Sequence, residues 1–539
     1  MERTWGKYLY LLCIPLGVVI LFSGRHYICY IGDEFYMSLC VRDYKNCPLG
    51  FLTFYIGHLW CDAFGFSLLS LRTLSRFAYL VAIGVPAIYL YGKIRNVALV
   101  ATVFFLSTFI AILGGFGFYD WNTAAYPFES ILTVSLLVYA HKPSRMKAVG
   151  IGVFTGFVIL ARVTMIPILM LDIAVALLVN KGKRTWSGWI DVALLLLSLM
   201  LTIGVMLLLI CGSIQGMVTA FNPDNIITGH NLDAIGNYIW RFKLLFPPIF
   251  LSWSAGFICY YLASVTRRGK KKSVSFILSA VTCVIAGWCV LRMIALLFDY
   301  STGVYGLGFP YVLIPSFIFP FLVFGGRKDC CVEIHYLRLC SGVILIMLLM
   351  MGFGSDSFPE RWHTSFLFPL AIAETYPLLS KVYRNGYFRW FWMSIIMMTG
   401  MFLYKSYAIR KDFVWVENVP PVYAGLPMDK ALNPLIEEVE VEVRNMKSQG
   451  KRFTFWGAYH QTLSLLYETE PAFSIQLFHI PGKDIADYVK DLDSFDYVFV
   501  PYVEDTSLYE HTLESLEKRG FNVAKVTETF VLYENGNKN

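Results

Sequence analysis

The sequence predicts an α-helical membrane protein with about thirteen transmembrane helices and a small C-terminal α/β domain. Three observations lead to this fold class. The 539 residues are 57% hydrophobic and only 15% charged, whereas soluble domains carry about 25% charged residues. Long apolar segments recur up to residue 405, separated by short basic loops. After residue 428 the segments become charged and alternate between helical and strand patterns, as in a soluble domain.

The basic loops indicate how the predicted helices are oriented. Lysine and arginine cluster in short segments at residues 142–147, 181–184, 267–272, 325–328 and 381–384. Such clusters are typical of cytoplasmic loops, and alternating sides from a cytoplasmic N-terminus places all of them inside. The net charge of +7 therefore reflects membrane topology and does not indicate a nucleic acid partner.

The apolar segments give the approximate positions of the spans. The first is retained, because no small-residue cleavage site follows it. The spans are expected at residues 6–23, 75–92, 97–116, 128–141, 147–163, 164–180, 188–212, 246–265, 273–297, 310–325, 334–353, 364–380 and 387–405. An odd number of spans leaves the long loops 24–74, 213–245, 298–309 and 354–363, and everything after residue 405, outside the cytoplasm.

The first outer loop, residues 24–74, contains two predicted interfacial helices. Asp33 and Glu34 begin a short stretch that runs to Arg42, just past the first span. Residues 47–65 are apolar but interrupted by polar side chains, which fits a helix lying in the membrane interface. The acidic pair is therefore either solvated at the interface or part of a reaction centre.

The C-terminal part divides into a linker, residues 406–427, and an α/β domain, residues 428–539. Strands are predicted in the segments "KRFTFWG", "DYVFVPY" and "VTETFVLYEN". Helices are predicted in "MDKALNPLIEEVEVEVRNMKSQ" and in "DTSLYEHTLESLEKRG", the latter ending at Gly520. This domain is expected outside the cytoplasm.

Charged residues gather on the predicted outer face. The acids there are Asp33, Glu34, Asp120 and Glu129, and the cations at the ends of apolar segments are Arg72, Arg76, Arg162, Arg292 and Arg361. Acids can activate an acceptor, and the planar guanidinium group suits bidentate binding of phosphate. Structural ion pairs are the alternative for each of these residues.

Cysteine usage leaves the redox state of the first outer loop open. Four of the 12 cysteines fall there, namely Cys29, Cys40, Cys47 and Cys61. One or two disulfides are expected if that side is oxidising, but the connectivity cannot be deduced from spacing. Buried free thiols are the alternative.

The first outer loop resembles that of the GT-C class of glycosyltransferases, which use lipid-linked sugars and include protein O-mannosyltransferases and aminoarabinose transferases. The similarity lies in "GDEFYMSLCVRDYKNCPLGFLTFYIGHLWCDAFGFSLLSLRTLSRF". The segments "FESILTVSLLVYA", "GIGVFTGFVILARVTMIPIL" and "ERWHTSFLFPLAIAE" resemble later parts of the same pattern in the same order. The sequence departs from it at Asn46-Cys47-Pro48, where mannosyltransferases often have His-Pro-Pro, and at Glu129, which replaces an aspartate.

The resemblance implies an inverting glycosyltransferase with a polyprenyl-phosphate sugar as donor. Asp33 would be the general base, with Glu34 and Glu129 as further catalytic acids. Arg72 would bind the departing lipid phosphate, with Arg361 and Lys45 as further candidates. Candidates for substrate binding are Asp120, Arg162 and His363. The donor sugar and the acceptor, which is a glycan, a lipid or a protein, stay open.

No cofactor is required by this chemistry, although Asp33, Glu34 and Glu129 offer the carboxylate oxygens that a divalent metal ion would accept. The retained first span and the compact outer domain favour a bacterial inner membrane over an endoplasmic reticulum. A transporter or flippase is the main alternative, kept open by the mid-span prolines Pro86, Pro315 and Pro320. A non-catalytic membrane scaffold is a second alternative.

Overall fold

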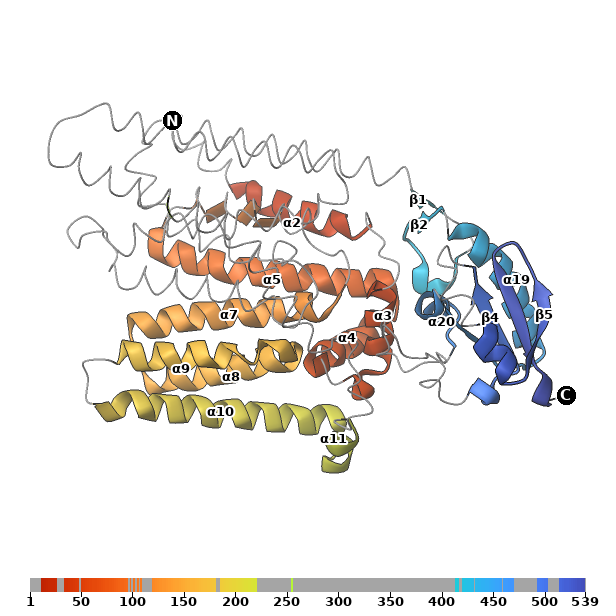
Figure 1. Cartoon of the computed structure of the whole chain (residues 1–539). Coiled ribbons are helices and arrows are strands. Elements are labelled where there is room, and N and C mark those ends of the chain that lie inside the picture. Colours follow the sequence, from red (N-terminus) through yellow and green to blue (C-terminus); the bar gives the residue numbers. More distant parts are fainter. Residues whose placement is uncertain are drawn as a thin grey trace, which may run out of the picture.

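The computed structural model describes two parts of the chain (Figure 1). The N-terminal part covers residues 11–26, 33–47, 50–95, 97, 100–101, 104–105, 107–108, 119–180 and 185–220, and residue 254 is also described. The C-terminal part covers residues 413–415, 419–430, 432–457, 459–469, 492–502 and 513–538. Apart from residue 254, the predicted spans from residue 246 to residue 405 lie outside these residues, as do Arg292, Arg361 and His363.

The N-terminal part is helical, and its long helices lie side by side (Figure 1). The helices are α2 (Cys13–Ser23), α3 (Asp33–Arg42), α4 (Phe51–Phe64), α5 (Leu68–Ile94), α7 (Trp121–His141), α8 (Arg145–Ala161), α9 (Ile168–Val179), α10 (Thr185–Cys211) and α11 (Ile214–Ala220). Six of the predicted spans correspond to α2, α5, α7, α8, α9 and α10. Within the described residues, three helices are long and apolar enough to cross a membrane: Leu68–Gly92, Trp121–His141 and Trp186–Cys211.

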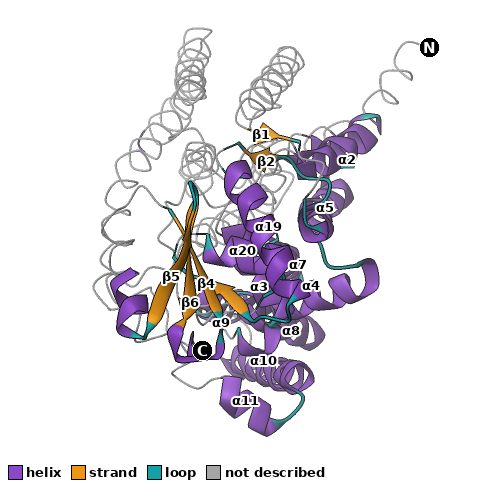
Figure 2. Cartoon of the chain, turned by 90° about the vertical axis from the view of Figure 1, so that its right-hand side faces the viewer, coloured by secondary structure: helices purple, strands orange, loops and turns teal. Residues whose placement is uncertain are grey.

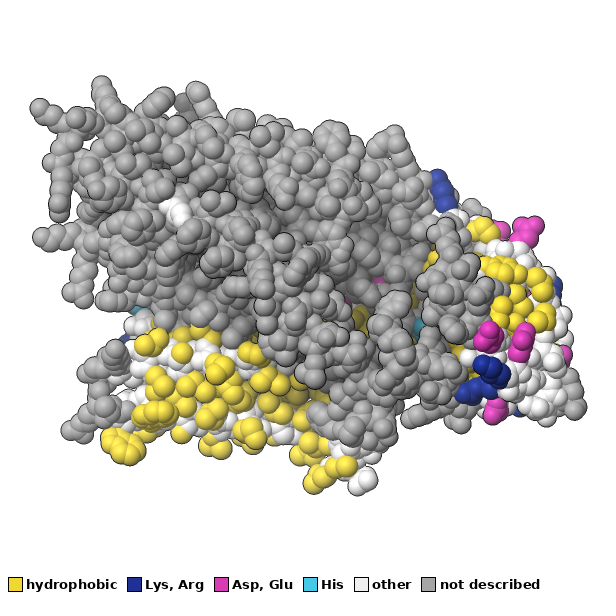
Figure 3. Space-filling view, viewed as in Figure 1, with side chains coloured by type: hydrophobic (Ala, Val, Ile, Leu, Met, Phe, Trp, Pro, Cys, Tyr) yellow, Lys and Arg dark blue, Asp and Glu magenta, His cyan; other side chains and the backbone are white. Residues whose placement is uncertain are grey.

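Helix α10 has the surface expected of a helix in contact with lipid. Leu197, Met200 and Leu201 are each about two-thirds exposed, at 67%, 68% and 66%, and Leu208 and Leu209 are also exposed. Figure 3 shows a broad hydrophobic surface over this side of the helical part. In water so much exposed apolar area would be unfavourable, whereas hydrocarbon solvates it.

The opposite side of α10 packs closely against α8. A Cβ atom placed on Gly152 would lie 2.1 Å from Ser198 Oγ and 2.2 Å from the carbonyl oxygen of Leu195. The absence of a side chain at Gly152 therefore lets the two backbones approach, as is typical of helix pairs in membranes.

Helices α3 and α4 cover one end of the bundle, as the sequence predicted for two short helices in the first outer loop. Thr53 Oγ1 on α4 donates a 2.8 Å hydrogen bond to the carbonyl oxygen of Ala161, the last residue of α8. The hydroxyl of Tyr119, just before α7, donates to the carbonyl oxygen of Thr53 at 2.8 Å. These bonds tie α4 to the end of the bundle where α7 begins and α8 ends.

The C-terminal part is an α/β structure with a mixed sheet. Four strands, β3 (Phe453–Phe455), β4 (Tyr497–Pro501), β5 (Phe521–Val526) and β6 (Phe530–Asn535), lie in the order β3-β4-β6-β5. Strand β3 is parallel to β4, and the other neighbours are antiparallel. The helices are α19 (Asn433–Ser448) and α20 (His460–Leu466), and a two-stranded sheet joins β1 (Phe413–Val414) to β2 (Met428–Asp429). The three predicted strands are present, whereas β5 was not predicted.

The C-terminal part packs directly on α3. Helix α20 contacts both β3 and α3, so that it lies between the sheet and the helical part (Figures 1 and 2). Phe35 and Leu39 of α3 belong to the same hydrophobic core as α19, α20 and the sheet. The ring of Phe35 stacks on Tyr423 with centroids 6.1 Å apart, and Arg42 Nη2 donates to the carbonyl oxygen of Thr469 at 3.2 Å.

Candidate active site

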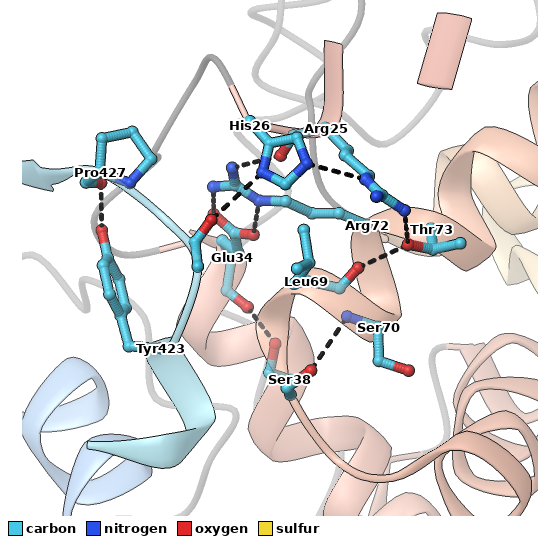
Figure 4. A network of polar contacts seen from close by, with 12 residues as sticks. Arg25, His26, Glu34, Ser38, Leu69, Ser70, Arg72, Thr73, Tyr423 and Pro427 are labelled. Atoms are coloured by element: carbon cyan, nitrogen blue, oxygen red, sulfur yellow. Dashed lines mark hydrogen bonds and ion pairs between the residues drawn. The ribbon is translucent and has the colours of Figure 1, made fainter. Parts of the chain in front are cut away.

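A buried ion pair joins α3 to α5. Arg72 Nε and Nη2 each donate a 2.6 Å hydrogen bond to a different carboxylate oxygen of Glu34 (Figure 4). Glu34 is only 2% exposed and Arg72 only 1% exposed. Two parallel bonds between ionised groups are the strongest arrangement available to this pair, and they compensate for the loss of hydration. This contact is the structural ion pair that the sequence analysis kept as the alternative to ligand binding for both residues.

The pair is extended by residues that follow the first helix. Arg72 Nη1 donates to the backbone carbonyl of Arg25 at 2.9 Å, and Arg76 Nη2 donates to that of Gly24 at 3.3 Å. The side chain of Arg25 reaches Thr73 on α5, with a 3.3 Å distance from Nη1 to Oγ1 (Figure 4). Three guanidinium groups therefore gather near the start of α5.

His26 connects this cluster to the C-terminal part of the chain. Its Nε2 accepts a hydrogen bond from Arg25 Nε at 3.0 Å, so its Nδ1 carries the proton that is donated to the carbonyl oxygen of Gly425 at 3.2 Å. Gly425 has a φ of +80°, which a side chain would make unfavourable. The loop between Tyr423 and Pro427 is thus joined to this cluster through His26 (Figure 4).

Asp33 is the first residue of α3 and precedes Glu34 directly. The position of its side chain is outside the described part of the structure. Its role as a general base stays a prediction, and the backbone shows only that it begins the helix that Glu34 anchors.

Glu129 is a buried acid without a hydrogen bond to the described residues. It lies on α7, is 0% exposed, and neither carboxylate oxygen has a hydrogen-bond partner there. Within the described part of the chain, the Glu129 carboxylate interacts electrostatically with the guanidinium group of Arg162. Arg162 follows the last residue of α8 and is 6% exposed. A buried acceptor that the described residues do not satisfy is costly unless another group donates to it, and a ligand that donates hydrogen bonds is one such group.

Asp120 has a structural role that the sequence analysis did not assign to it. It caps the N-terminus of α7, where its Oδ1 accepts a 2.7 Å hydrogen bond from the backbone N–H of Thr123. Asn122 Nδ2 donates to its Oδ2 at 2.8 Å. Burial raises the pKa of Asp120, and the hydrogen bond from Thr123 opposes that rise. Its predicted role in substrate binding stays untested.

The remaining predicted residues are not brought to this cluster by the described structure. Lys45 is exposed and lies over the ring of Tyr44, with its Nζ 5.7 Å from the ring centroid. Arg361 and His363 lie outside the described residues. Among the residues that the structure describes, no three His, Cys, Asp or Glu side chains form a group that would hold a metal ion. The metal site considered for Asp33, Glu34 and Glu129 stays a prediction.

Sequence reasoning missed Arg25 and His26. Their signal was a pair of basic residues directly after the first apolar segment, which we interpreted as part of the loop. Their importance depends on the contacts to Thr73 and Gly425, which are distant in the sequence and follow no local pattern.

Comparison with known proteins gives a match in structure. No protein-family model matches the chain, and no curated protein matches it significantly. The crystal structure of ArnT from Cupriavidus metallidurans bound to undecaprenyl phosphate is similar over 97% of this chain and 97% of that chain, with a TM-score of 0.51 and 12% sequence identity. The chain has the fold of ArnT. The apo structure of the same protein gives a TM-score of 0.46, with 12% identity over 99% of this chain and 98% of that one.

The ArnT fold confirms the predicted resemblance to GT-C transferases at the level of the fold. The similarity to ArnT extends over nearly the whole chain and so includes its C-terminal part. At 12% identity it carries no residue-by-residue assignment.

Proposed function

We propose that this protein is an integral-membrane glycosyltransferase that moves a sugar from a polyprenyl-phosphate donor to an extracytoplasmic acceptor with inversion. One observation carries the proposal: the chain has the fold of ArnT over 97% of its length, and that ArnT structure holds undecaprenyl phosphate. The cluster of Glu34, Arg25, Arg72 and Arg76 at one end of the bundle supports it, because it combines carboxylate and guanidinium groups.

The reaction needs one proton acceptor and one stabilised leaving group. The acceptor hydroxyl or amine attacks the anomeric carbon of the sugar and gives its proton to Asp33. The bond from the anomeric carbon to the phosphate oxygen breaks at the same time, and its electron pair leaves with the polyprenyl phosphate. Guanidinium groups stabilise the charge that develops on that phosphate. Arg72 is a proposed contact, and Arg361 and Lys45 are further candidates.

Glu34 has a different role from Asp33 in this scheme. Both of its oxygens accept hydrogen bonds from Arg72, so its carboxylate fixes α3 on α5. Because Asp33 is its neighbour on α3, this pair would set the position of the base. Glu34 is therefore a positioning residue in our proposal.

The general base is tested by the Asp33→Asn substitution. Reconstituted protein is supplied with a panel of polyprenyl-phosphate sugars, and the release of polyprenyl phosphate is measured. We expect transfer to fall by about 100- to 10,000-fold, since a well-placed base contributes that much. Asp62→Asn is a matched control, because Asp62 belongs to the same outer loop but is 62% exposed and pairs with His58. Undiminished transfer in the Asp33 variant would exclude it as the base.

The role of Glu129 is tested by Glu129→Gln. We propose that Glu129 and Arg162 contact the sugar or the acceptor, because the Glu129 carboxylate accepts no hydrogen bond from the described residues. The variant should keep its thermal stability while transfer falls by about 10- to 100-fold, the effect of losing one strong hydrogen bond to a ligand. Asp191→Asn is the comparison, since Asp191 accepts a 2.6 Å bond from Tyr139 and should affect stability instead. Normal transfer with lowered stability in Glu129→Gln would make Glu129 structural.

We also propose that the C-terminal part and the end of the bundle that it covers lie outside the cytoplasm, in the plasma membrane of a bacterial-type cell envelope. The proposal is supported by the basic segment 142–147, which joins α7 to α8 at the ends of these helices that lie away from the C-terminal part.

The proposed reaction requires no metal ion or cofactor. A divalent ion bound by the acidic residues would be an additional component of the site and would not replace any step of the reaction.

A further inference from the structure

Arg25 is the arginine of the cluster near the start of α5 that a ligand can reach. Arg72 and Arg76 are each 1% exposed, whereas Arg25 is only half-buried. Arg25 donates from Nε to His26 and from Nη1 to Thr73, and among the described residues it has no carboxylate partner and no acceptor for Nη2. Because a guanidinium group has five N–H donors, Arg25 keeps donors for a further acceptor.

The charge of the cluster favours an anionic ligand. The described side chains include three guanidinium groups, those of Arg25, Arg72 and Arg76, and one carboxylate, that of Glu34. Glu34 already accepts two hydrogen bonds from Arg72, so it does not compensate the charge of Arg25. An anion with oxygen acceptors would therefore be attracted to Arg25 and could accept charge-assisted hydrogen bonds from it.

The position of Arg25 in the chain indicates a phosphate that is attached to a lipid. Arg25 lies in the short helix Gly24–His26, which directly follows α2. Helix α2 corresponds to the first predicted span, so its end is expected at the depth of the lipid headgroups. A lipid-linked phosphate lies at that same depth.

His26 fixes the orientation of the Arg25 guanidinium group. Its Nε2 accepts a 3.0 Å hydrogen bond from Arg25 Nε, and Thr73 Oγ1 accepts one from Nη1 at 3.3 Å (Figure 4). Two of the three nitrogens are therefore held by the protein, and Nη2 is left for a ligand.

The C-terminal part determines which nitrogen of His26 can accept this bond. The carbonyl oxygen of Gly425 can only accept, so its 3.2 Å contact requires the proton on Nδ1 and leaves a lone pair on Nε2. The loop is held in place because the ring of Tyr423 stacks on Phe35 and its hydroxyl donates to the carbonyl oxygen of Pro427 at 2.8 Å. The docked loop thereby favours the tautomer that orients the neighbouring arginine.

We propose that Arg25 binds the phosphate group of the polyprenyl-phosphate donor and that His26 is a positioning residue for this contact. The inference rests on the proposed function and adds a cation that the sequence analysis did not single out. It also connects the C-terminal part to the donor, through the Gly425 carbonyl and His26. Arg72 keeps its bonds to Glu34 in this arrangement.

Binding of undecaprenyl phosphate tests the role of Arg25 without sugar transfer. The purified full-length protein is titrated with this lipid in detergent, and the bound fraction is measured by native mass spectrometry. We expect Arg25→Gln to bind about 10- to 100-fold more weakly, the effect of losing a hydrogen bond from a charged group. Arg444→Gln is the matched control and should not change the affinity, since Arg444 is 73% exposed on α19 and pairs with Glu440.

Inorganic phosphate distinguishes a lipid-linked phosphate from a free one. Added at the same concentration as undecaprenyl phosphate, it should not displace the lipid, because it lacks the apolar chain that holds the lipid in the membrane part. Displacement would overturn the assignment to a lipid-linked phosphate.

Two substitutions of His26 separate positioning from a general loss of structure. His26→Gln keeps an acceptor oxygen that can reach Arg25 Nε, so it should retain most of the affinity. His26→Leu removes the acceptor and should weaken binding by about 3- to 10-fold, the effect of losing one hydrogen bond, while thermal unfolding of the two variants stays alike. Equal affinities would overturn the positioning role. Both variants keep Arg25, so they test the contact even where Arg25→Gln fails to fold.

Transfer assays on the same samples distinguish this inference from the proposed function. Weakened binding in Arg25→Gln, together with an unmodified protein that transfers no sugar, would reject the proposed function and leave a phosphate site at Arg25. Undiminished binding in Arg25→Gln, or no binding by the unmodified protein, would overturn the inference. Sugar transfer that persists in that case would leave the proposed function in place.

Discussion

At the scale of single residues, the Glu34–Arg72 pair is the best-defined feature of the candidate site. It is almost fully buried and its two 2.6 Å bonds are parallel. The sequence predicted that both residues lie on the outer face, but it assigned Arg72 to the lipid phosphate. In the structure, Nε and Nη2 of Arg72 donate to Glu34. A lipid phosphate would therefore have to accept from other N–H groups of Arg72, or compete with Glu34 for these two.

Removal of one partner of this pair should be strongly destabilising. Glu34→Ala leaves the Arg72 charge buried without its carboxylate, and we expect a cost of about 3–5 kcal/mol. Denaturant unfolding of the purified protein measures it. The exposed pair Arg444–Glu440 provides the control, because Arg444 is 73% exposed and Arg444→Ala should cost only about 0–1 kcal/mol.

A double substitution separates stability from function. Glu34→Leu/Arg72→Met replaces the buried charges with apolar groups of similar size and should recover much of the lost stability. Transfer should not return, because neither the anchored acid nor the cation is present. A Glu34→Ala variant as stable as the Arg444→Ala control would show that the pair is not a structural anchor.

Residue-level reasoning identified charged side chains that the structure buries, but it did not identify the partners of these side chains. Glu34, Glu129, Arg72 and Arg162 are buried near one end of the bundle, as expected of reactive or paired charges. Asp120 was predicted as a ligand contact, yet its hydrogen bonds are those of a helix cap. The Asp120-x-x-Thr123 spacing was a local signal for that cap.

At the scale of elements, helical periodicity and polar interruptions predicted most of the N-terminal part. The range Asp33–Arg42 was predicted as a short helix, and α3 has these bounds. Strand β5 was missed because it is an edge strand whose residues after Phe521 are exposed, so it lacks the apolar alternation of a buried strand.

Helix packing gives a prediction of its own at Gly152. Gly152→Ala should destabilise the pair α8–α10 by about 1–3 kcal/mol, since the new Cβ would overlap Ser198 Oγ and the backbone of Leu195. Gly150→Ala is a control on the same helix, because a Cβ there meets no atom within 4 Å and alanine favours helix. Thermal unfolding in detergent distinguishes the two. Equal stabilities would mean that the two helices pack less closely than described.

At the scale of the whole molecule, the C-terminal α/β part and the helical part share a core through α3. Phe35 and Leu39 face this core, while Glu34 binds α5, so one short helix joins both parts. The similarity to ArnT covers 97% of the chain. The packing on α3 means that motion of the C-terminal part would act directly on the helix that carries Asp33.

The orientation of the molecule can be measured by cysteine labelling of intact cells. Val441→Cys lies on α19 and is 59% exposed, so we expect a membrane-impermeant maleimide to label it from outside. Met146→Cys is 79% exposed in the basic segment 142–147 and should react only after the cells are opened. The unmodified protein gives the background. The reverse pattern would place the C-terminal part in the cytoplasm.

The sequence by itself determined the class of protein, the six N-terminal helical segments named above, the two short helices of the first loop and three strands of the sheet. These follow from composition and from local periodicity, which depend on neighbours along the chain. Only the tertiary structure decided that Arg72 binds Glu34 and that Arg25 and His26 join this cluster. Burial forces a charged or polar group to find whichever partner the packing brings near, and that partner is not encoded in any local pattern.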